Sequence, residues 1–196
     1  DGNYEIHVGA DINLVFGGAG NDMLYGDAGD DLIHGNSGDD NVWGGLGFDD
    51  ISVDAGDDTL LGGAGYDKVK GGDDNDRLFG DDGNDTLDGG AGSDILVGGA
   101  GADLLTGGNG SDIFVINSTL AGLADGPDTF LDFRLKVDKI AFHTEVASDA
   151  IAMTNVGSHL HITVKNDDVE IVAAIMENVD KNMVLSSDFM THVDIA

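Results

Sequence analysis

The sequence predicts an all-β solenoid, in which short strands stack along one axis instead of around a central core. A nine-residue row repeats eleven times without insertion from Gly17 to Val115. The sixth residue of every row is Asp, and the eighth is always a large apolar residue. One carboxylate and one core side chain therefore recur in fixed phase, as in repeat architectures that grow by stacking.

Each row has two parts with different chemistry. The first six residues are rich in Gly, Asp and Asn and predict a turn, and the last three predict a minimal strand. Because side chains alternate along a strand, the eighth residue should point inward and the seventh and ninth outward. Two rows then complete one coil. Where the second Gly is replaced, by Asp27, Asn36, Asp54 or Asp81, we expect positive φ, which Asp and Asn tolerate best among non-glycine residues.

Residues 1–16 predict an N-terminal strand followed by a degenerate first row. Tyr4, Ile6 and Val8 alternate with polar residues, as in a half-buried strand. In the next row Val15 holds the core position, but Asn13 stands where Asp is expected. Such a row is typical of a terminal cap, which has a neighbour on one side only.

After Val115 the nine-residue period ends, and residues 116–196 predict a β-rich C-terminal cap. Short strands are expected at Thr129–Phe133 and Lys139–Phe142. Residues 159–164 alternate cleanly, and with Val169–Met176 they predict a hairpin. The expected organisation is therefore an N-terminal cap (1–16), an eleven-row array (17–115) and a C-terminal cap (116–196).

The charge of the chain predicts a missing cation. Its 38 acidic and 8 basic residues give a net charge of −30, so compact folding must overcome strong self-repulsion. Nucleic acid and anionic membranes are poor partners for a polyanion. The chain has no cysteine, which leaves oxygen ligands for a metal. It begins at Asp1 without a signal sequence, so we expect a part of a longer protein or one exported without an N-terminal signal.

The repeated Asp residues predict calcium as that cation. Calcium binds about six to eight oxygens from carboxylates and backbone carbonyls, whereas magnesium demands a tighter octahedron. The array holds 22 Asp and no Glu, within turns whose small side chains expose carbonyls. An ion between the turns of rows two apart would take one carboxylate from each, which gives roughly nine ions. The expected ligands are Asp22, Asp31, Asp40, Asp49, Asp58, Asp67, Asp76, Asp85, Asp94, Asp103 and Asp112.

These rows match the nonapeptide G-G-x-G-x-D-x-U-x, and the chain resembles the RTX (repeats-in-toxin) family. The resemblance implies a right-handed parallel β-roll with calcium between same-side turns, held by the sixth-position Asp residues. The segments Asp128–Phe133 and Asp138–Ile140 are similar to those that follow the rolls of secreted proteases, lipases and alginate epimerases. The ends Asp188–Met190 and Asp194–Ala196 resemble tails recognised by type I secretion.

The implied function is a calcium-folded module of a secreted bacterial protein. Its partners would be calcium, the remainder of the parent chain and the type I secretion apparatus. No HExxH, GxSxG or P-loop motif occurs, so we expect no catalysis within these residues. The chain would then be a non-catalytic part of a larger protein, with a secreted protease, lipase or epimerase as examples.

The ninth positions leave a second function open. Odd rows place Tyr25, Trp43, Leu61 and Phe79 in one apolar stripe, continued by valines, whereas even rows carry polar residues there. A stripe of this length is rarely left bare. Either a cap or a further domain covers it, or it forms an adhesive or polysaccharide-binding surface on which Tyr25 and Trp43 stack.

Two rows depart from the motif. Val53 replaces the first Gly of the fifth row, and Asp74 replaces a conserved Gly of the seventh. Both flank the ion expected between the turns of Asp58 and Asp76, which should be the weakest.

Three further features of the C-terminal cap leave alternatives open. Asp132 and Asp138 could bind an extra ion or form turns and caps. His159 and His161 are spaced to share one face of a strand, but no third zinc ligand is evident.

Overall fold

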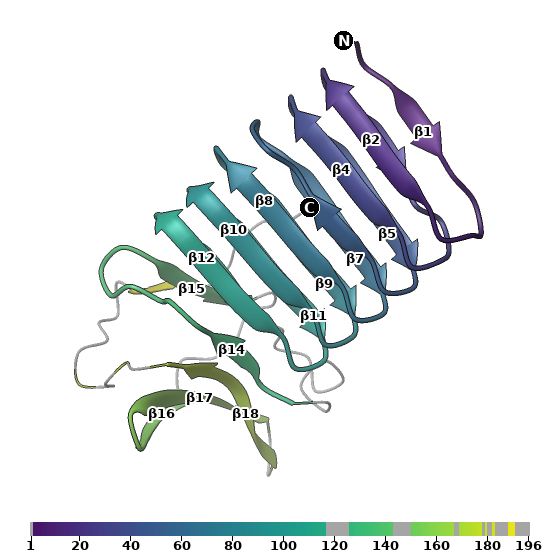
Figure 1. Cartoon of the computed structure of the whole chain (residues 1–196). Coiled ribbons are helices and arrows are strands. Elements are labelled where there is room, and N and C mark those ends of the chain that lie inside the picture. Colours follow the sequence, from purple (N-terminus) through teal and green to yellow (C-terminus); the bar gives the residue numbers. More distant parts are fainter. Residues whose placement is uncertain are drawn as a thin grey trace.

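The computed structural model describes residues 2–116, 126–142, 150–166, 169–177, 179, 182 and 188–190. Among these residues the regular elements are strands, with no α-helix, and the predicted parallel β-roll is confirmed. Figure 1 shows the strands stacked along one axis with the N-terminus at one end. Within the described residues no helix is long and apolar enough to cross a membrane.

Two sheets form the walls of the roll. The odd-row sheet is parallel throughout. In spatial order it consists of β1 (Glu5–His7), β3 (Met23–Tyr25), β5 (Asn41–Leu46), β7 (Thr59–Ala64), β9 (Arg77–Asp82), β11 (Ile95–Ala100), β13 (Ile113–Ile116), β15 (Lys139–Phe142) and β19 (Phe189–Met190).

The even-row sheet is parallel up to β18 and ends in antiparallel pairs. It consists of β2 (Leu14–Ala19), β4 (Leu32–Ser37), β6 (Asp50–Ser52), β8 (Lys68–Asp73), β10 (Thr86–Gly92), β12 (Leu104–Gly110), β14 (Asp128–Phe130), β18 (Val169–Met176), β17 (His159–Asn166) and β16 (Ile151–Val156).

The register confirms that two rows make one coil. Leu24 pairs with Val42, and Val42 pairs with Leu60. Most strands are longer than predicted, because they run on through the first three residues of the next row. Gly45 and Gly63 remain paired in the ladder although both have positive φ (113° and 109°). The turn is therefore confined to the fourth to sixth positions of such rows.

The eighth-position side chains form one continuous core, as predicted. All eleven, from Leu24 to Phe114, are at most 1% exposed. Val15, in the degenerate first row, extends this core toward the N-terminus, and Phe130 and Ile140 extend it past the array. Burying one large apolar residue per row is worth about 1.5–3 kcal/mol each, and this thin column is the main apolar contribution.

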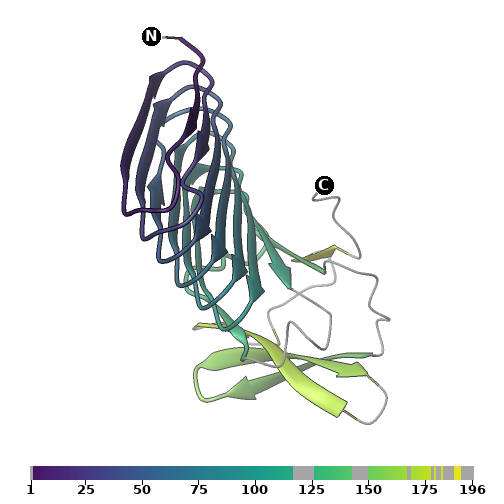
Figure 2. The same cartoon turned by 90° about the vertical axis from the view of Figure 1, so that its right-hand side faces the viewer.

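The C-terminal segment continues the two walls before it changes architecture. β14 and β15 each add one parallel strand, and β17 and β18 form the predicted hairpin. Figure 2 shows this smaller antiparallel unit at the base of the roll. The strand expected at Thr129–Phe133 is shorter and ends at Phe130. The tail Asp194–Ala196 lies outside the described residues.

The second-position substitutions follow the prediction at three sites of four. Asp27, Asn36 and Asp81 have φ values of 66°, 72° and 71°. The prediction is wrong for Asp54, which does not adopt positive φ. Its row begins with the buried, β-branched Val53, β6 ends at Ser52, and the Asp54 amide donates to the Asn36 carbonyl at 2.7 Å.

Candidate metal centre

The eleven sixth-position Asp residues form two buried columns, one along each edge of the roll. Each is at most 2% exposed. Within a column, the amide of one Asp donates to Oδ1 of the Asp two rows further on. Asp22 N donates to Asp40 Oδ1 at 2.8 Å, and Asp58 N donates to Asp76 Oδ1 at 2.9 Å. One carboxylate oxygen of each residue is thus fixed by the backbone.

The second oxygen, Oδ2, is buried without a hydrogen-bond partner in ten of the eleven residues, among the described part of the chain. A buried carboxylate oxygen without a partner destabilises the fold, and a bound cation would remove this cost. The ten residues are Asp22, Asp31, Asp40, Asp49, Asp58, Asp67, Asp76, Asp85, Asp94 and Asp103.

In ten of the eleven rows the first residue is a glycine that keeps space free beside this oxygen, and Val53 is the exception. A Cβ on Gly17 would lie 2.5 Å from Asp22 Oδ2 and 2.8 Å from the carbonyl oxygen of Gly35. On Gly62 it would lie 2.6 Å from Asp67 Oδ2 and 2.9 Å from the Gly80 carbonyl oxygen. A charged oxygen and a carbonyl oxygen thus converge on one small volume, and this donor set fits calcium.

Backbone carbonyls are essential to such a site. Within the described residues, no group of three or more His, Cys, Asp or Glu side chains is placed to hold a metal. His159 and His161, both on β17, are therefore not part of such a group. The Asp columns instead offer one or two carboxylates per position, and the turn backbone would complete the shell. Hard oxygen ligands of this mixed kind favour calcium over softer metals.

The electrostatics of the two Asp columns also indicate that a cation binds beside these carboxylates. Burial, the largest cause, raises the pKa of Asp49 and Asp94 to about 6, of Asp58 and Asp85 to about 7, and of Asp76 to about 8. Donation by a backbone amide lowers each pKa, and neighbouring carboxylates raise it again. The metal-free fold therefore disfavours the ionised form of these groups at neutral pH.

Both columns continue past the array through residues that lack the nonapeptide period. Asp103 N donates to Asp128 Oδ1, and Asp112 N donates to Asp138 Oδ1, each at 3.2 Å. Nine Asp pairs lie within the array, and Asp103 with Asp128 makes a tenth pair whose Oδ2 on Asp103 is unpaired. Asp112 differs, because its Oδ2 accepts from Arg134 at 3.0 Å.

Asp132 has a capping role. Its two carboxylate oxygens accept from the Gly107 and Gly108 amides, each at 2.8 Å. These amides begin the last row, where the parallel ladder would otherwise end. Of the two roles open from the sequence, the structure places Asp132 as a cap and Asp138 as the last member of the odd column.

A second ladder, on the outer side of the odd turns, was missed by sequence reasoning. The Asp57 amide donates to Asp39 Oδ1 at 3.1 Å, and the Asn75 amide donates to Asp57 Oδ1 at 2.9 Å. The ladder continues from the Asp39 amide to Asn21 Oδ1 and from the Ser93 amide to Asn75 Oδ1. The Asn and Asp residues at the fifth position of odd rows are the signal that could have revealed it.

The two departures from the motif change different features of the turns. Asp74 has a φ of 77°, whereas the glycines at that position of other rows have φ between 121° and 154°. The side chain of Val53 reaches toward Gly35, where its Cγ1 lies 2.6 Å from an added Cβ and takes the place of a carbonyl oxygen. Val53 therefore alters the surroundings of Asp40 Oδ2, and it also replaces the glycine that other rows place beside the Asp of the same row, here Asp58. That the ion between Asp58 and Asp76 is the weakest stays a prediction.

The predicted apolar stripe lies on the outer face of the odd-row sheet. Tyr25, Trp43, Leu61 and Phe79 pair in register and are partly buried. Tyr25 stacks on Trp43 with ring centroids 4.5 Å apart. His7 also stacks on Tyr25, with ring centroids 4.1 Å apart. Further along, Val97 and Val115 are buried in a small cluster with Ala141, so this end of the stripe is covered, which is one of the two alternatives left open by the sequence.

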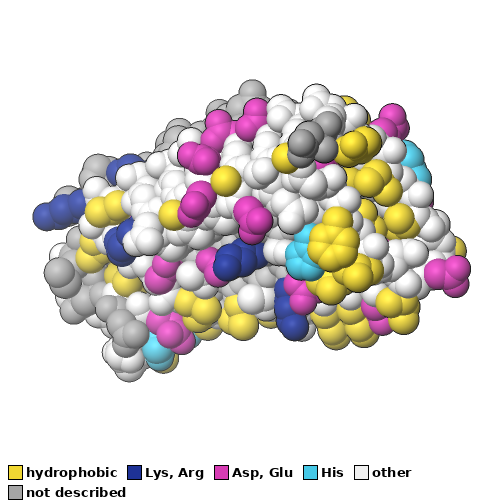
Figure 3. Space-filling view, turned by 45° about the horizontal axis from the view of Figure 1, so that its top comes forward, with side chains coloured by type: hydrophobic (Ala, Val, Ile, Leu, Met, Phe, Trp, Pro, Cys, Tyr) yellow, Lys and Arg dark blue, Asp and Glu magenta, His cyan; other side chains and the backbone are white. Residues whose placement is uncertain are grey.

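The even-row face is less uniformly polar than predicted. At its N-terminal end Leu14, Phe16 and Leu32 are exposed, and Phe16 stacks on His34 at 5.1 Å. Figure 3 shows hydrophobic side chains gathered toward this end of the roll. Two of these residues precede the array, and Leu32 is a seventh-position residue, so comparison of the ninth positions could not show them.

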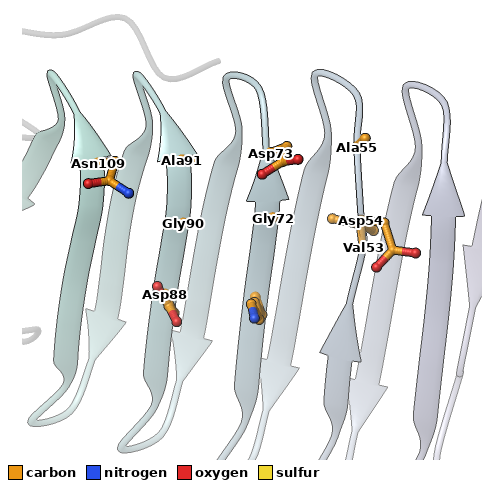
Figure 4. A pocket seen from close by; sticks show the side chains of 10 residues that line it. Val53, Asp54, Ala55, Gly72, Asp73, Asp88, Gly90, Ala91 and Asn109 are labelled. Carbon is orange, nitrogen blue, oxygen red and sulfur yellow. The ribbon is translucent and has the colours of Figure 1, made fainter.

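A shallow hollow of about 430 Å³ lies further along the even-row face. Its lining includes Asp54, Asp73, Asp88 and a single cation, Lys70. Figure 4 shows Asp73 and Asp88 on the neighbouring strands β8 and β10, with Asp54 just beyond the end of β6. This excess of negative charge disfavours anionic ligands at the hollow.

The fold and the columns define a class of protein, a metal-binding parallel β-roll. The pattern of the RTX calcium-binding nonapeptide repeat (4 copies) matches residues 16–51, 52–87 and 88–115, about half of the chain. The chain therefore belongs to this family, whose repeats bind calcium and are typical of secreted bacterial proteins. No curated protein matches the chain in sequence.

Two solved structures that are similar to the chain share low sequence identity with it. The extracellular lipase LipA from Serratia marcescens is 20% identical with a TM-score of 0.43, and the match covers 94% of this chain and 40% of the lipase. The AlgE6R2 subunit of the mannuronan C5-epimerase from Azotobacter vinelandii is 16% identical with a TM-score of 0.38, covering 93% of this chain and 94% of the subunit. The chain thus spans two fifths of the length of the lipase.

Proposed function

We propose that this chain is a calcium-operated folding module of an exported protein. At low calcium the polyanion stays unfolded and is threaded through a type I secretion apparatus, and at high external calcium it folds. The observation that carries this proposal is the set of ten buried, unpaired Asp Oδ2 atoms, nine of which lie beside space kept free by the first glycine of the row. Metal binding and folding are then one reaction.

The calcium levels of the two compartments suit such a switch. Extracellular calcium modules bind at about 10⁻⁴ to 10⁻³ M, well above cytosolic levels. Sites formed only when turns stack have no counterpart in the unfolded chain, so binding energy becomes folding energy. The folded module would then stabilise the remainder of its parent chain outside the cell.

Circular dichroism in chelator and in millimolar calcium tests this proposal. We expect a disordered spectrum without calcium and a β spectrum with it, with a steep calcium dependence because many ions bind together. Magnesium at equal concentration serves as the control and should be much less effective. A fully folded β spectrum in chelator at neutral pH would refute the proposal.

The apolar stripe supports a second candidate function, an adhesive or polysaccharide-binding module. Tyr25, Trp43, Leu61 and Phe79 remain partly exposed on the outer face of the odd-row sheet. Because Tyr25 and Trp43 stack on each other, a sugar would meet ring edges and the aliphatic Leu61 more readily than free ring faces.

Trp43 is the single tryptophan of the chain, so its fluorescence reports on this face directly. Titration with neutral and with alginate-like oligosaccharides, at a fixed free calcium concentration, tests the second function. A saturable spectral shift that Leu61→Ser abolishes and Lys70→Ala preserves would support it. Unchanged fluorescence with both classes of sugar would exclude polysaccharide binding at the stripe.

A further inference from the structure

The odd column ends in a contact that no other row makes. Arg134 donates from Nη2 to Asp112 Oδ2 at 3.0 Å, to Asp138 Oδ1 at 3.0 Å and to the Gly110 carbonyl at 2.9 Å. These acceptors are two carboxylates of one column and a turn carbonyl beside them. They are the same kinds of oxygen that converge at the ten unpaired positions.

We infer that the guanidinium of Arg134 is a built-in cation that takes the place of a calcium ion at the last position of the odd column. The inference rests on the proposed function, because it assigns the remaining positions to calcium. Arg134 would close this end of the roll at any calcium concentration, and the other positions would await the ion.

The two ends of the roll provide an internal comparison. Each column gains one Asp beyond the array, Asp128 on the even side and Asp138 on the odd side. On the even side Asp103 Oδ2 remains buried and unpaired, whereas on the odd side Asp112 Oδ2 is paired with Arg134. The difference between the ends is therefore the arginine, and we count ten calcium positions, with the eleventh filled by the protein.

The geometry suits a cation held in place by the chain itself. The Arg134 amide donates to Asp138 Oδ2 at 2.6 Å, and its Nε donates to the same oxygen at 3.3 Å. The planar guanidinium therefore binds Asp138 through Nε and Nη2, and the same Nη2 also donates to Asp112. Asp112 and Asp138 are at most 1% exposed, whereas the arginine side chain is 38% exposed at the rim. Such multiple charge-assisted bonds are characteristic of arginine and less available to lysine.

Native mass spectrometry at saturating calcium, combined with circular dichroism, tests the inference. Arg134→Gln removes the cation, and we expect it to bind one calcium ion more than the wild type. The calcium concentration at which half of the protein is folded should rise about 1.5-fold. The rise is small because the free energy lost with one partly exposed ion pair is shared among many bound ions. The matched control is Arg77→Gln, which removes the same charge from an outer strand position near Phe79 and should change neither value.

Arg134→Lys keeps the charge and should retain the calcium count of the wild type. If Arg134→Gln fails to fold while Arg134→Lys folds, a cation at this place is required and the inference is supported. If both fail to fold, or if Arg134→Gln keeps the wild-type count and midpoint, the inference is overturned. A wild type that folds without calcium would instead refute the proposed function.

Discussion

The metal-free protein should be unfolded at neutral pH and should regain β structure on acidification to about pH 5. The perturbation is pH in the presence of chelator. The raised pKa values, about 6 for Asp49 and Asp94, about 7 for Asp58 and Asp85 and about 8 for Asp76, lie above the ordinary value of 3.8. The metal-free fold thus binds more protons than the unfolded chain. Its stability is fully present below about pH 4 and is lost as the pH rises to about 8.

The magnitude is large enough to decide the state of the chain. At pH 7, the raised pKa of each of these five carboxyls costs the fold about 3–4 kcal/mol relative to the unfolded chain, on the order of 15–20 kcal/mol together. A domain is stable by only about 5–15 kcal/mol, so the metal-free fold should not persist. At pH 5 most of these groups are protonated, and the total cost falls to about half.

Far-UV circular dichroism of dilute protein in chelator, from pH 8 to pH 5, measures this transition above the isoelectric point of about 4.1. Asp76→Asn is the informative variant, because an amide cannot ionise but its oxygen can still accept from the Asp58 amide. In chelator at pH 7 it should gain about 4 kcal/mol, whereas in calcium it should need more calcium to fold because it lacks one ligand. Equal structure at pH 8 and pH 5 in chelator, or a variant destabilised alike in both conditions, would refute the reasoning.

Three other substitutions test the columns and the core. Gly89→Ala places a methyl group against Asp94 Oδ2 and should remove one ion from the count in native mass spectrometry, leaving a roll that folds at higher calcium. Val53→Gly restores the missing glycine and should abolish the weakest step of a calcium titration followed by calorimetry; an unchanged titration would show that this position is not the weakest. Leu78→Ala should cost about 2–5 kcal/mol in thermal melts at saturating calcium, since Leu78 is fully buried, whereas the exposed Thr86→Ala should cost less than about 0.5 kcal/mol.

The nine-residue period predicted most of the roll, because each side chain of a strand must point inward or outward, and the direction of one residue fixes that of its neighbours. The eighth residue alternates inward, and eleven copies in phase leave no other register that buries Leu24 and its equivalents. The Asp columns follow for the same reason. A residue at a constant place in a repeated turn stacks on its own copy two rows away.

Features without a period could not be predicted from spacing. The strands lengthen because glycines with positive φ, such as Gly45, still join the ladder, although glycine-rich sequence is typical of turns. The burial of Val115 depends on a cluster with Ala141, which lies in a later coil. Arg134 reaches Asp112 across 22 residues through a segment that has left the repeat. These contacts depend on tertiary structure, which no single row contains.

The negative charge of the roll comes from two groups of carboxylates, the buried sixth-position Asp residues and the exposed Asp residues on the outer side of the turns. The sixth-position residues are buried and shielded from salt, so mobile monovalent ions cannot neutralise them, and an ion must enter the turn or a side chain such as Arg134 must supply the charge. The outer residues, including Asp30, Asp39 and Asp57, are exposed, and some of them stay engaged in amide ladders. Their repulsion opposes the compact state but is screened by salt. Folding is thus governed by the inner population, while the outer one leaves the loaded roll strongly anionic.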